Sequence, residues 1–248
     1  MLAIIGGNGM AQLPGLEISH RQIIRTPYGE PSGPFTFGKI RNRDVAFLGR
    51  HGHNFTIPPH AINYRANICA LHSLQPSHVV AITSVRGIRS DLAPGRLVIP
   101  NQIIDYTHSR KFTFFEDTEQ RFKQADFTVP YSQQTRALLL QGARDANLEM
   151  LDGGVYAATQ GPRLETAAEI NRIERDGADM VGMTGMPEAI LARELELNYA
   201  TIAVVASCAA GRDTYIDATE CREIYEIVEQ AMAKVRKILE YVVSCYGD

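Results

Sequence analysis

The chain has 248 residues, and its 25 Lys and Arg against 28 Asp and Glu give a formal net charge of -3 at pH 7. Hydrophobic residues make up 45% of it and charged residues 21%, a balance that excludes a disordered or fibrous protein. No run of Lys and Arg forms a basic stripe, which disfavours nucleic acid as a partner. No apolar stretch approaches the roughly 20 residues that cross a membrane, and the N-terminus has no leader pattern. We therefore expect a cytoplasmic globular protein that binds neither nucleic acid nor membrane.

The cysteines do not form a pattern typical of metal or disulfide sites. Cys69, Cys208, Cys221 and Cys245 have no CxxC spacing, and no histidine pair lies at ligand spacing. Zinc sites and disulfide frameworks usually show such spacings. The sequence therefore predicts free thiols and no metal site.

Strand and helix patterns alternate along the chain. Short apolar runs next to Gly, Pro or polar turn residues predict buried strands; they are Leu2–Ile5, Val45–Leu48, Val79–Thr83, Leu97–Ile99 and Ala200–Ala206. Helical periods and helix-start signals predict helices over Ile62–Leu74, Thr135–Ala146, a stretch opening at Thr166 with Glu169 in a capping box, Pro187–Leu195, and Ile224–Val242. The alternation predicts a three-layer α/β architecture in one domain.

The segment from Asp105 to Pro130 has no clear period. It is aromatic and polar, with Tyr106, Phe112, Phe114, Phe115, Phe122 and Phe127. Long irregular segments in compact domains are often functional loops, and aromatic side chains line ligand pockets. A surface loop over a small satellite core is an equally good interpretation.

A glycine loop follows the first predicted strand. Gly6-Gly7-Asn8-Gly9 could present backbone N–H groups to an anion, because glycine permits the positive φ values and close approach that this needs. The loop is not a Walker A motif, and Gln12 breaks a GxGxxG pattern. A simple tight turn is the alternative.

Arg50-His51-Gly52-His53 directly follows the strand Val45–Leu48. Open α/β sheets bind ligands at the carboxyl ends of strands, and a guanidinium offers a planar fork of donors to phosphate. These residues therefore favour an oxyanion clamp. A surface arginine beside a structural histidine is the alternative.

Two turns between a strand and a helix carry further candidates. Gly161 to Thr166 precedes one helix and Gly182 to Glu188 another. Thr184 could donate its hydroxyl and N–H to phosphate near a helix N-terminus, where the helix dipole favours anions. A helix cap is the alternative for Thr184, and a capping carboxylate is the alternative for Glu165.

With these motifs in this order and at these separations, the chain resembles the family of trimeric nucleoside phosphorylases that includes purine nucleoside and methylthioadenosine phosphorylases. The resemblance covers nearly the whole chain. The motifs that carry it are Ile4-Ile5-Gly6-Gly7-Asn8-Gly9, Thr26-Pro27-Tyr28-Gly29, Arg50-His51-Gly52, Asn63-Tyr64-Arg65-Ala66-Asn67, Gln160-Gly161-Pro162-Arg163 and Gly177-Ala178-Asp179-Met180-Val181-Gly182-Met183-Thr184.

The resemblance implies a single-domain three-layer α/β/α nucleoside phosphorylase fold over residues 1–248, with a central mixed twisted sheet, and a homotrimer. It also implies a pentosyltransferase that catalyses reversible phosphorolysis of a purine nucleoside. Inorganic phosphate is then a co-substrate, and no metal or other cofactor is implied. Positioning and preorganised donors would supply most of the catalysis.

The resemblance assigns roles by position. Phosphate would be held by Asn8, Arg50, His51, Ser84, Val85 and Thr184, of which Arg50, His51 and Thr184 are the expected catalytic residues. The nucleoside would be held by Leu164, Glu165, Met183, Ser207, Cys208 and Ala209, with Met183 beneath the ribose.

The base pocket predicts a 6-oxopurine. Family members that act on 6-aminopurines carry an Asp-x-Asp pair where this chain has Ser207-Cys208-Ala209. Members that act on 6-oxopurines carry a Glu after Gly-Pro-x-x, as here with Glu165, which can accept from the N1–H that only a 6-oxopurine presents. A buried carboxylate left without its donor would reject adenine strongly.

For the sugar, the N-terminal Ile-Gly-Gly-x-Gly pattern and the chain length look closest to the methylthio-nucleoside branch. We expect S-methyl-5'-thioinosine as substrate, in purine salvage, with a 5' pocket formed near Tyr215–Ala218 and by Phe127–Tyr131 of a neighbouring subunit, whose apolar groups suit a thioether. Inosine or guanosine is the first alternative, and methylthioadenosine the second.

The chain departs from the family pattern at a few positions. Asn8 stands where Thr or Ser is usual, Val85 and Arg86 where Ala and Gly are usual, and Ser207 where 6-oxopurine enzymes usually have Asn. These changes could mean altered specificity, slow turnover, or a catalytically weak purine-binding protein on an enzyme fold. The retained Arg50, His51, Thr184 and Glu165 favour the enzyme.

Overall fold

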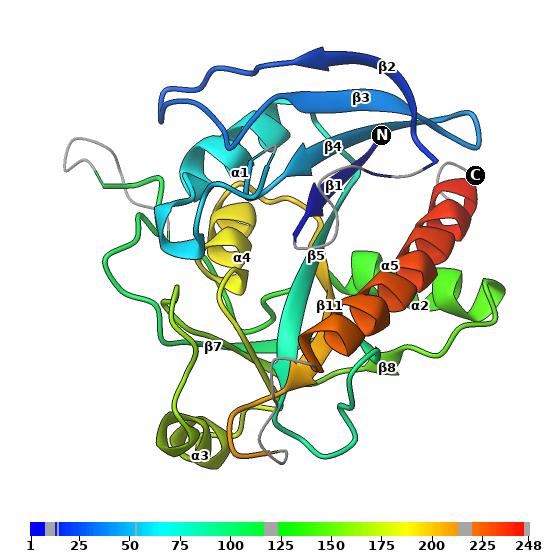
Figure 1. Ribbon diagram of the computed structural model, residues 1–248. Coiled ribbons are helices and arrows are strands. Elements are labelled where there is room, and N and C mark those ends of the chain that lie inside the picture. Colours follow the sequence, from blue (N-terminus) through cyan, green and yellow to red (C-terminus); the bar gives the residue numbers. More distant parts are fainter. Residues whose placement is uncertain (8–12, 14, 53, 117–123, 213–219, 246–248) are drawn as a thin grey trace.

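The computed structural model describes residues 1–7, 13, 15–52, 54–116, 124–212 and 220–245 (Figure 1). The strands are β1 Leu2–Gly6, β2 Glu17–Gln22, β3 Phe35–Ile40, β4 Arg43–Gly49, β5 His78–Gly87, β6 Leu97–Ile99, β7 Gln102–Asp105, β8 Leu151–Asp152, β9 Val155–Ala158, β10 Met180–Gly182 and β11 Tyr199–Cys208. The helices are α1 Tyr64–Ser73, α2 Gln133–Asp145, α3 Ala167–Arg175, α4 Gly185–Glu194 and α5 Glu220–Cys245, with a short 3-10 turn at Pro59–Ala61.

One mixed sheet runs through the described part of the protein. Its main path is β2-β3-β4-β1-β5-β10-β9-β7, and β11 branches from β5 to pair with β6, which pairs with β8. Strands β1, β4, β5 and β11 are parallel neighbours, whereas β10 runs antiparallel to β5. The carboxyl ends of the four parallel strands therefore meet at one edge of the sheet.

Helices cover both faces of this sheet (Figure 1). Successive side chains of a strand point to opposite faces. Ala3 and Ile5 of β1 accordingly pack with α1 and α4, and Leu2 and Ile4 pack with α2 and α5. The result is the expected α/β/α arrangement of three layers.

The predicted helices and the five predicted strands are all present, with boundaries shifted by a few residues. The predicted capping box is confirmed, because the Thr166 side chain accepts from the Glu169 N–H and the Glu169 carboxylate accepts from the Thr166 N–H. In the described part of 105–130, only Asp105, the last residue of β7, belongs to a strand or helix. None of the helices described is long and apolar enough to cross a membrane.

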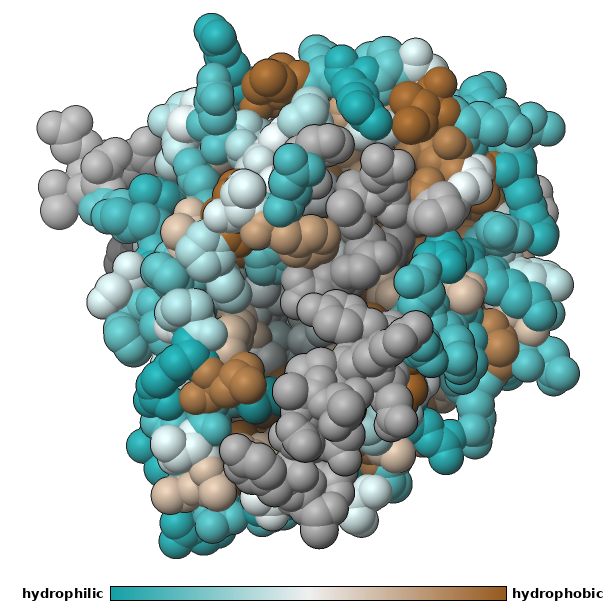
Figure 2. Space-filling view, in the orientation of Figure 1, coloured by the Kyte–Doolittle hydropathy of each residue, from teal (hydrophilic) through white to brown (hydrophobic). Residues whose placement is uncertain are grey.

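The remaining strands had no clear sequence signal. All of β2 is exposed and largely polar, so it lacks the alternation that marks a half-buried strand. Strands β8 and β10 have only two and three residues, which is too short for a period to appear. The face in Figure 2 is mostly hydrophilic where its residues are described, with hydrophobic residues in small separate groups.

Candidate active site

Most of the predicted site residues meet in one hollow at the carboxyl ends of the parallel strands. We call this hollow, of about 280 Å³, the strand-end pocket. The predicted residues that line it are Arg50, His51, Ser84, Val85, Leu164, Met183, Thr184 and Ser207. Residues from five separate parts of the chain are thus brought together, as expected where parallel strands end.

Arg50 is held by a buried ion pair. It follows β4 directly and is 1% exposed. Its Nε lies 2.6 Å from Glu188 Oε2 and its Nη2 lies 2.8 Å from Oε1, while Nη1 donates to the Ile82 carbonyl at 3.0 Å. Burial opposes the charge, but Glu188 outweighs it and raises the pKa of Arg50 above its ordinary value. Of the five guanidinium N–H groups, two have no partner among the described residues.

Gly7 lies next to the contact between Arg50 and the Ile82 carbonyl. A Cβ on this residue would lie 2.6 Å from the Ile82 carbonyl oxygen, closer than real Cβ atoms approach, and 3.1 Å from Arg50 Nη1, which is tight. Glycine is therefore required here for the chain to pass the Ile82 carbonyl. Asn8, the residue of this loop predicted to bind phosphate, lies outside the described residues.

His51 lines the pocket in its neutral form. Its Nδ1 lies 2.9 Å from the Ile57 carbonyl oxygen, and a carbonyl only accepts, so the ring carries a proton on Nδ1. Burial lowers the pKa of His51, and the neighbouring Arg50 charge lowers it further, although Ile57 and Glu188 oppose this. The second ring nitrogen is then an acceptor.

Thr184 presents its hydroxyl next to β5. Its Oγ1 lies 2.9 Å from Thr83 Oγ1, and its backbone N–H points to the Tyr156 hydroxyl at 3.3 Å. Thr184 is the N-cap residue of α4 by position, as the cap alternative has it, but its side chain makes no capping hydrogen bond to the helix. Ser84 and Val85 of β5 line the same pocket.

The loop that carries Met183 is fixed by Arg110, a residue with no recognisable signal in the sequence. Arg110 is buried and donates from Nη1 to the carbonyls of Met183 and Met186 at 2.8 and 2.6 Å, and from Nη2 to the carbonyl of Gln160 at 2.6 Å. Gly161 has a φ of +62°, and a Cβ there would lie 2.6 Å from Met183 Sδ. The Gly-Pro-Arg turn thus packs directly against the expected ribose-facing methionine.

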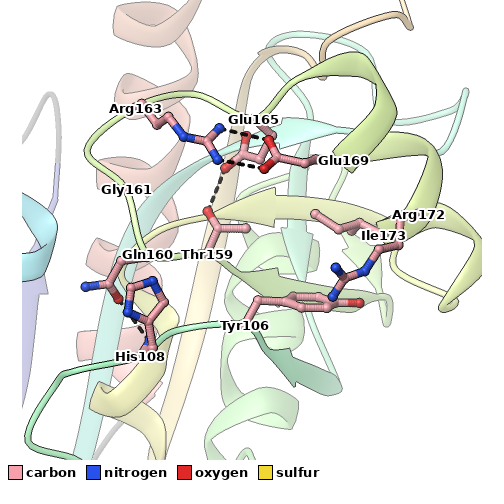
Figure 3. Close-up of a pocket in the computed structure, with 10 residues that line it drawn as sticks. All are labelled: Tyr106, His108, Thr159, Gln160, Gly161, Arg163, Glu165, Glu169, Arg172 and Ile173. Atoms are coloured by element: carbon pink, nitrogen blue, oxygen red, sulfur yellow. Dashed lines mark hydrogen bonds and ion pairs between the residues drawn. The ribbon is translucent and has the colours of Figure 1, made fainter.

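Glu165 lies in a second hollow of about 370 Å³, which we call the Glu165 pocket (Figure 3). The residue is 8% exposed. Its Oε1 accepts from Thr159 Oγ1 at 2.6 Å, and its Oε2 pairs with Arg86 Nη2. The alternative that Glu165 caps α3 is wrong, because Thr166 and Glu169 form that cap.

The Arg86–Glu165 ion pair lies between the two pockets. Arg86 of β5 lines the strand-end pocket, and its partner Glu165 lines the other. The Arg86 side chain is 15% exposed, and burial lowers its pKa. The basic side chain at this unusual position therefore points toward Glu165.

Ser207 is the register neighbour of Arg86. Strand β11 pairs in parallel with β5, and a register shift between Val205 and Ser207 places Ser207 opposite Arg86. Such irregularities often re-aim side chains beside active sites. Cys208 and Ala209 do not line the strand-end pocket; Ala209 is buried in a small apolar cluster instead.

Other side chains of the site were assigned no role from the sequence. Glu188, Arg110, Thr159 and Tyr156 support the pocket through contacts with residues far away in the chain. The only local signal was for Glu188, since an acidic residue in the first turn of a helix is favoured by the helix dipole. In the described part, no group of three or more His, Cys, Asp or Glu side chains could hold a metal ion.

We predict that Glu188→Ala will lower the free energy of unfolding by about 3–5 kcal/mol, because it leaves the Arg50 charge buried without a partner. Denaturant unfolding followed by circular dichroism measures this. The matched control is Arg41→Ala, which breaks the exposed Arg41–Glu240 pair and should change the free energy by less than about 1 kcal/mol. Equal losses in the two variants would contradict the role given to the buried pair.

We also predict that His51→Gln will flatten the acid side of the stability curve. The pKa of His51 in the folded protein lies below its ordinary value of 6.5, so at higher pH the His51 side chain is neutral in both the folded and the unfolded state. As the pH falls below 6.5, the unfolded state takes up a proton first and stability decreases until the folded pKa is passed. The variant should lose less stability than wild type on acidification. His78, whose pKa burial also lowers, retains part of the effect, and identical curves would contradict the prediction.

Comparison with known proteins gives a family model and relatives that are all phosphorylases. The Phosphorylase superfamily model matches residues 2–244. The chain is 47% identical over 98% of its length to a probable S-methyl-5'-thioinosine phosphorylase of Pseudomonas syringae pv. tomato, 98% of which is covered. It is 45% identical over 85% of its length to a 6-oxopurine nucleoside phosphorylase of Pyrococcus furiosus, 80% of which is covered.

A solved structure has the same arrangement of elements. The methylthioadenosine phosphorylase of Schistosoma mansoni in its apo form superposes with a TM-score of 0.90 at 29% identity, covering 98% of this chain and 90% of that one. The family model and the relatives each span most of the protein. The chain therefore belongs to the Phosphorylase superfamily and has the nucleoside phosphorylase fold.

Proposed function

We propose that the protein catalyses reversible phosphorolysis of S-methyl-5'-thioinosine to hypoxanthine and S-methyl-5-thioribose 1-phosphate, in purine salvage. The observation that carries this proposal is the position of the buried Glu165 beside a pocket lined by Arg50, His51, Ser84 and Thr184. A phosphate-sized anion and a purine would then occupy adjacent parts of one site. The names of relatives at 47% and 45% identity support it.

In the proposed reaction, a phosphate oxygen attacks C1' of the sugar while the C1'–N9 bond breaks. The electron pair of that bond leaves with the purine, which takes up a proton to become the free base. Charge thus shifts from phosphate toward the purine in the transition state. Donors already fixed in place stabilise such charge without reorganisation.

The phosphate end is assigned to Arg50 and its neighbours. Two Arg50 N–H groups without a described partner and the hydroxyls of Ser84 and Thr184 are donors of the kind that an anion requires. The neutral His51 can accept from a protonated phosphate oxygen. Because Glu188 already balances the Arg50 charge, these residues bind by geometry rather than by net positive charge.

A 6-oxopurine suits the base end better than a 6-aminopurine. Glu165 accepts at Oε1 from Thr159, and a carboxylate has lone pairs left for a base N1–H. The relatives named for 6-oxopurine or methylthioinosine substrates share 39–49% identity with the chain, against 29% for the methylthioadenosine enzyme. Inosine or guanosine is the second candidate, since one relative is named for 6-oxopurine nucleosides in general.

We predict phosphate-dependent release of base that is fastest with methylthioinosine. Methylthioinosine, inosine and methylthioadenosine are assayed in parallel, each with and without inorganic phosphate. Faster release from inosine would select the second candidate. Preference for methylthioadenosine would overturn the 6-oxopurine assignment, and no release from any nucleoside would favour a purine-binding protein.

The phosphate end is tested in the same assay with Thr184→Val, which removes a hydroxyl at nearly constant shape. The KM for phosphate should rise roughly fivefold or more, as expected for loss of a hydrogen bond to a charged ligand. Thr135→Val is the control, because it removes an equally buried hydroxyl on α2, outside the strand-end pocket. An unchanged phosphate KM in Thr184→Val would contradict the assignment.

We further propose that residues 1–248 form one domain, that the protein is a homotrimer, and that it is cytoplasmic. The resemblance to trimeric nucleoside phosphorylases supports the assembly, and a single sheet through the described residues supports one domain. Light scattering on the purified protein should give three times the chain mass. A monomer mass would contradict the trimer.

A further inference from the structure

Arg86 is placed to contact the base of a bound nucleoside. It lines the strand-end pocket together with Met183 and Ser207, and its guanidinium pairs with Glu165 in the neighbouring pocket. The side chain therefore stands at the junction of the phosphate end and the Glu165 pocket. A purine bound between these two ends must lie against it.

The Arg86 guanidinium has N–H donors without a hydrogen-bond partner among the described residues. Its contact with Glu165 uses Nη2, and Nε and Nη1 have no partner among the described residues. Arginine has five N–H groups and no acceptor, and it stays protonated in proteins. Whatever faces the remaining N–H groups must therefore be a hydrogen-bond acceptor.

Purines differ at the edge that such a fork can recognise. A 6-oxopurine presents two acceptors, O6 and N7, which arginine contacts with two parallel hydrogen bonds. A 6-aminopurine presents a donor, the 6-amino group, beside N7, and this pattern matches the amide of Gln or Asn instead. Arginine thus favours the first base and opposes the second.

Ser207 lacks the side-chain amide of the usual asparagine, and the neighbouring Arg86 can supply donors in its place. The two residues are register neighbours on β11 and β5, so their side chains belong to the same face of the sheet. A serine hydroxyl is short and offers one donor, whereas the arginine beside it is long and offers several. The unusual Arg86 and the unusual Ser207 are therefore coupled in space.

The contact also changes the role of Glu165. Glu165 Oε1 accepts from Thr159, and Oε2 faces the Arg86 charge in an ion pair but has no hydrogen-bond partner among the described residues, so adenine would not leave this carboxylate wholly uncompensated. Rejection of a 6-aminopurine by an unpaired Glu165 alone is then weaker than the sequence suggested. A second group must contribute to the discrimination.

Resting on the proposed function, we propose that Arg86 is a specificity-determining residue that donates to the O6 and N7 edge of a 6-oxopurine and is held in position by Glu165. The same contact stabilises the negative charge that accumulates on the departing purine. Arg86 thus selects the base and assists its departure, while Arg50 serves the phosphate end.

The test compares wild type with Arg86→Gln and Arg86→Met. The kcat/KM for methylthioinosine should fall roughly tenfold or more in both variants, since a hydrogen bond to a charged donor is lost. The ratio of kcat/KM for methylthioinosine to that for methylthioadenosine should fall in both, and furthest in the Gln variant, whose amide matches adenine. The phosphate KM should not change.

Arg89→Ala is the matched control. Arg89 lies three residues further along the chain and pairs with Asp91 and Asp179 at the surface, so this variant should keep the wild-type preference. Circular dichroism and the melting temperature establish that each variant is folded. Equal losses for both nucleosides in folded variants would show a structural role, and a raised phosphate KM would show a phosphate contact; either result overturns the proposal.

Binding of the free bases separates this proposal from the proposed function. Calorimetry with hypoxanthine and adenine requires no turnover, so it remains informative if wild type releases no base from any nucleoside. Wild type should bind hypoxanthine more tightly than adenine, and Arg86→Gln should lose that preference. An unchanged preference in the variant would overturn the role of Arg86 whatever the activity.

Discussion

The buried ion pair between Arg50 and Glu188 is the contact on which the geometry of the site depends. It joins the end of β4 to the first turns of α4, and the Ile82 carbonyl ties the same guanidinium to β5. Moving any of these elements away would leave a charge or a strong donor buried without a partner, which costs several kcal/mol. The strand-end pocket is therefore fixed before any ligand binds, and Gly7 is needed because a side chain there would collide with the Ile82 carbonyl.

Sequence patterns predicted the parts of this site that depend on local structure. Arg50 follows a clear apolar strand, and Thr184 stands between a strand and a helix, so both were predicted to lie where strands end. The residues that hold them were not predicted, because Glu188 and Arg110 find their partners 138 and about 73 residues away. Helix and strand periods report which face of an element is buried, but they carry no information about which distant side chain completes a hydrogen bond.

The same limit explains why Arg86 was difficult to interpret from the sequence. The predicted strand Val79–Thr83 ends before Arg86, whereas β5 continues to Gly87, so the sequence did not predict where this side chain points. The pairing of β11 with β5, including its register shift, brings Ser207 opposite Arg86, and the turn after β9 brings Glu165 into contact. Three separate segments thus determine the polarity of the base end, and none of them does so alone.

The two guanidinium groups that line the strand-end pocket are each balanced by a carboxylate, Arg50 by Glu188 and Arg86 by Glu165. Two uncompensated guanidinium groups around a hollow of about 280 Å³ would attract any small anion, because their field acts over a long range. Guanidinium groups that are paired with carboxylates attract anions only weakly at a distance, but they retain N–H donors with fixed directions. They therefore favour ligands whose acceptors match those directions. In phosphorolysis negative charge shifts from the attacking phosphate toward the departing purine in the transition state, and protonation then neutralises the purine. A site with one balanced arginine at each end can stabilise the charge on phosphate and the charge that develops on the purine without holding either ligand too tightly.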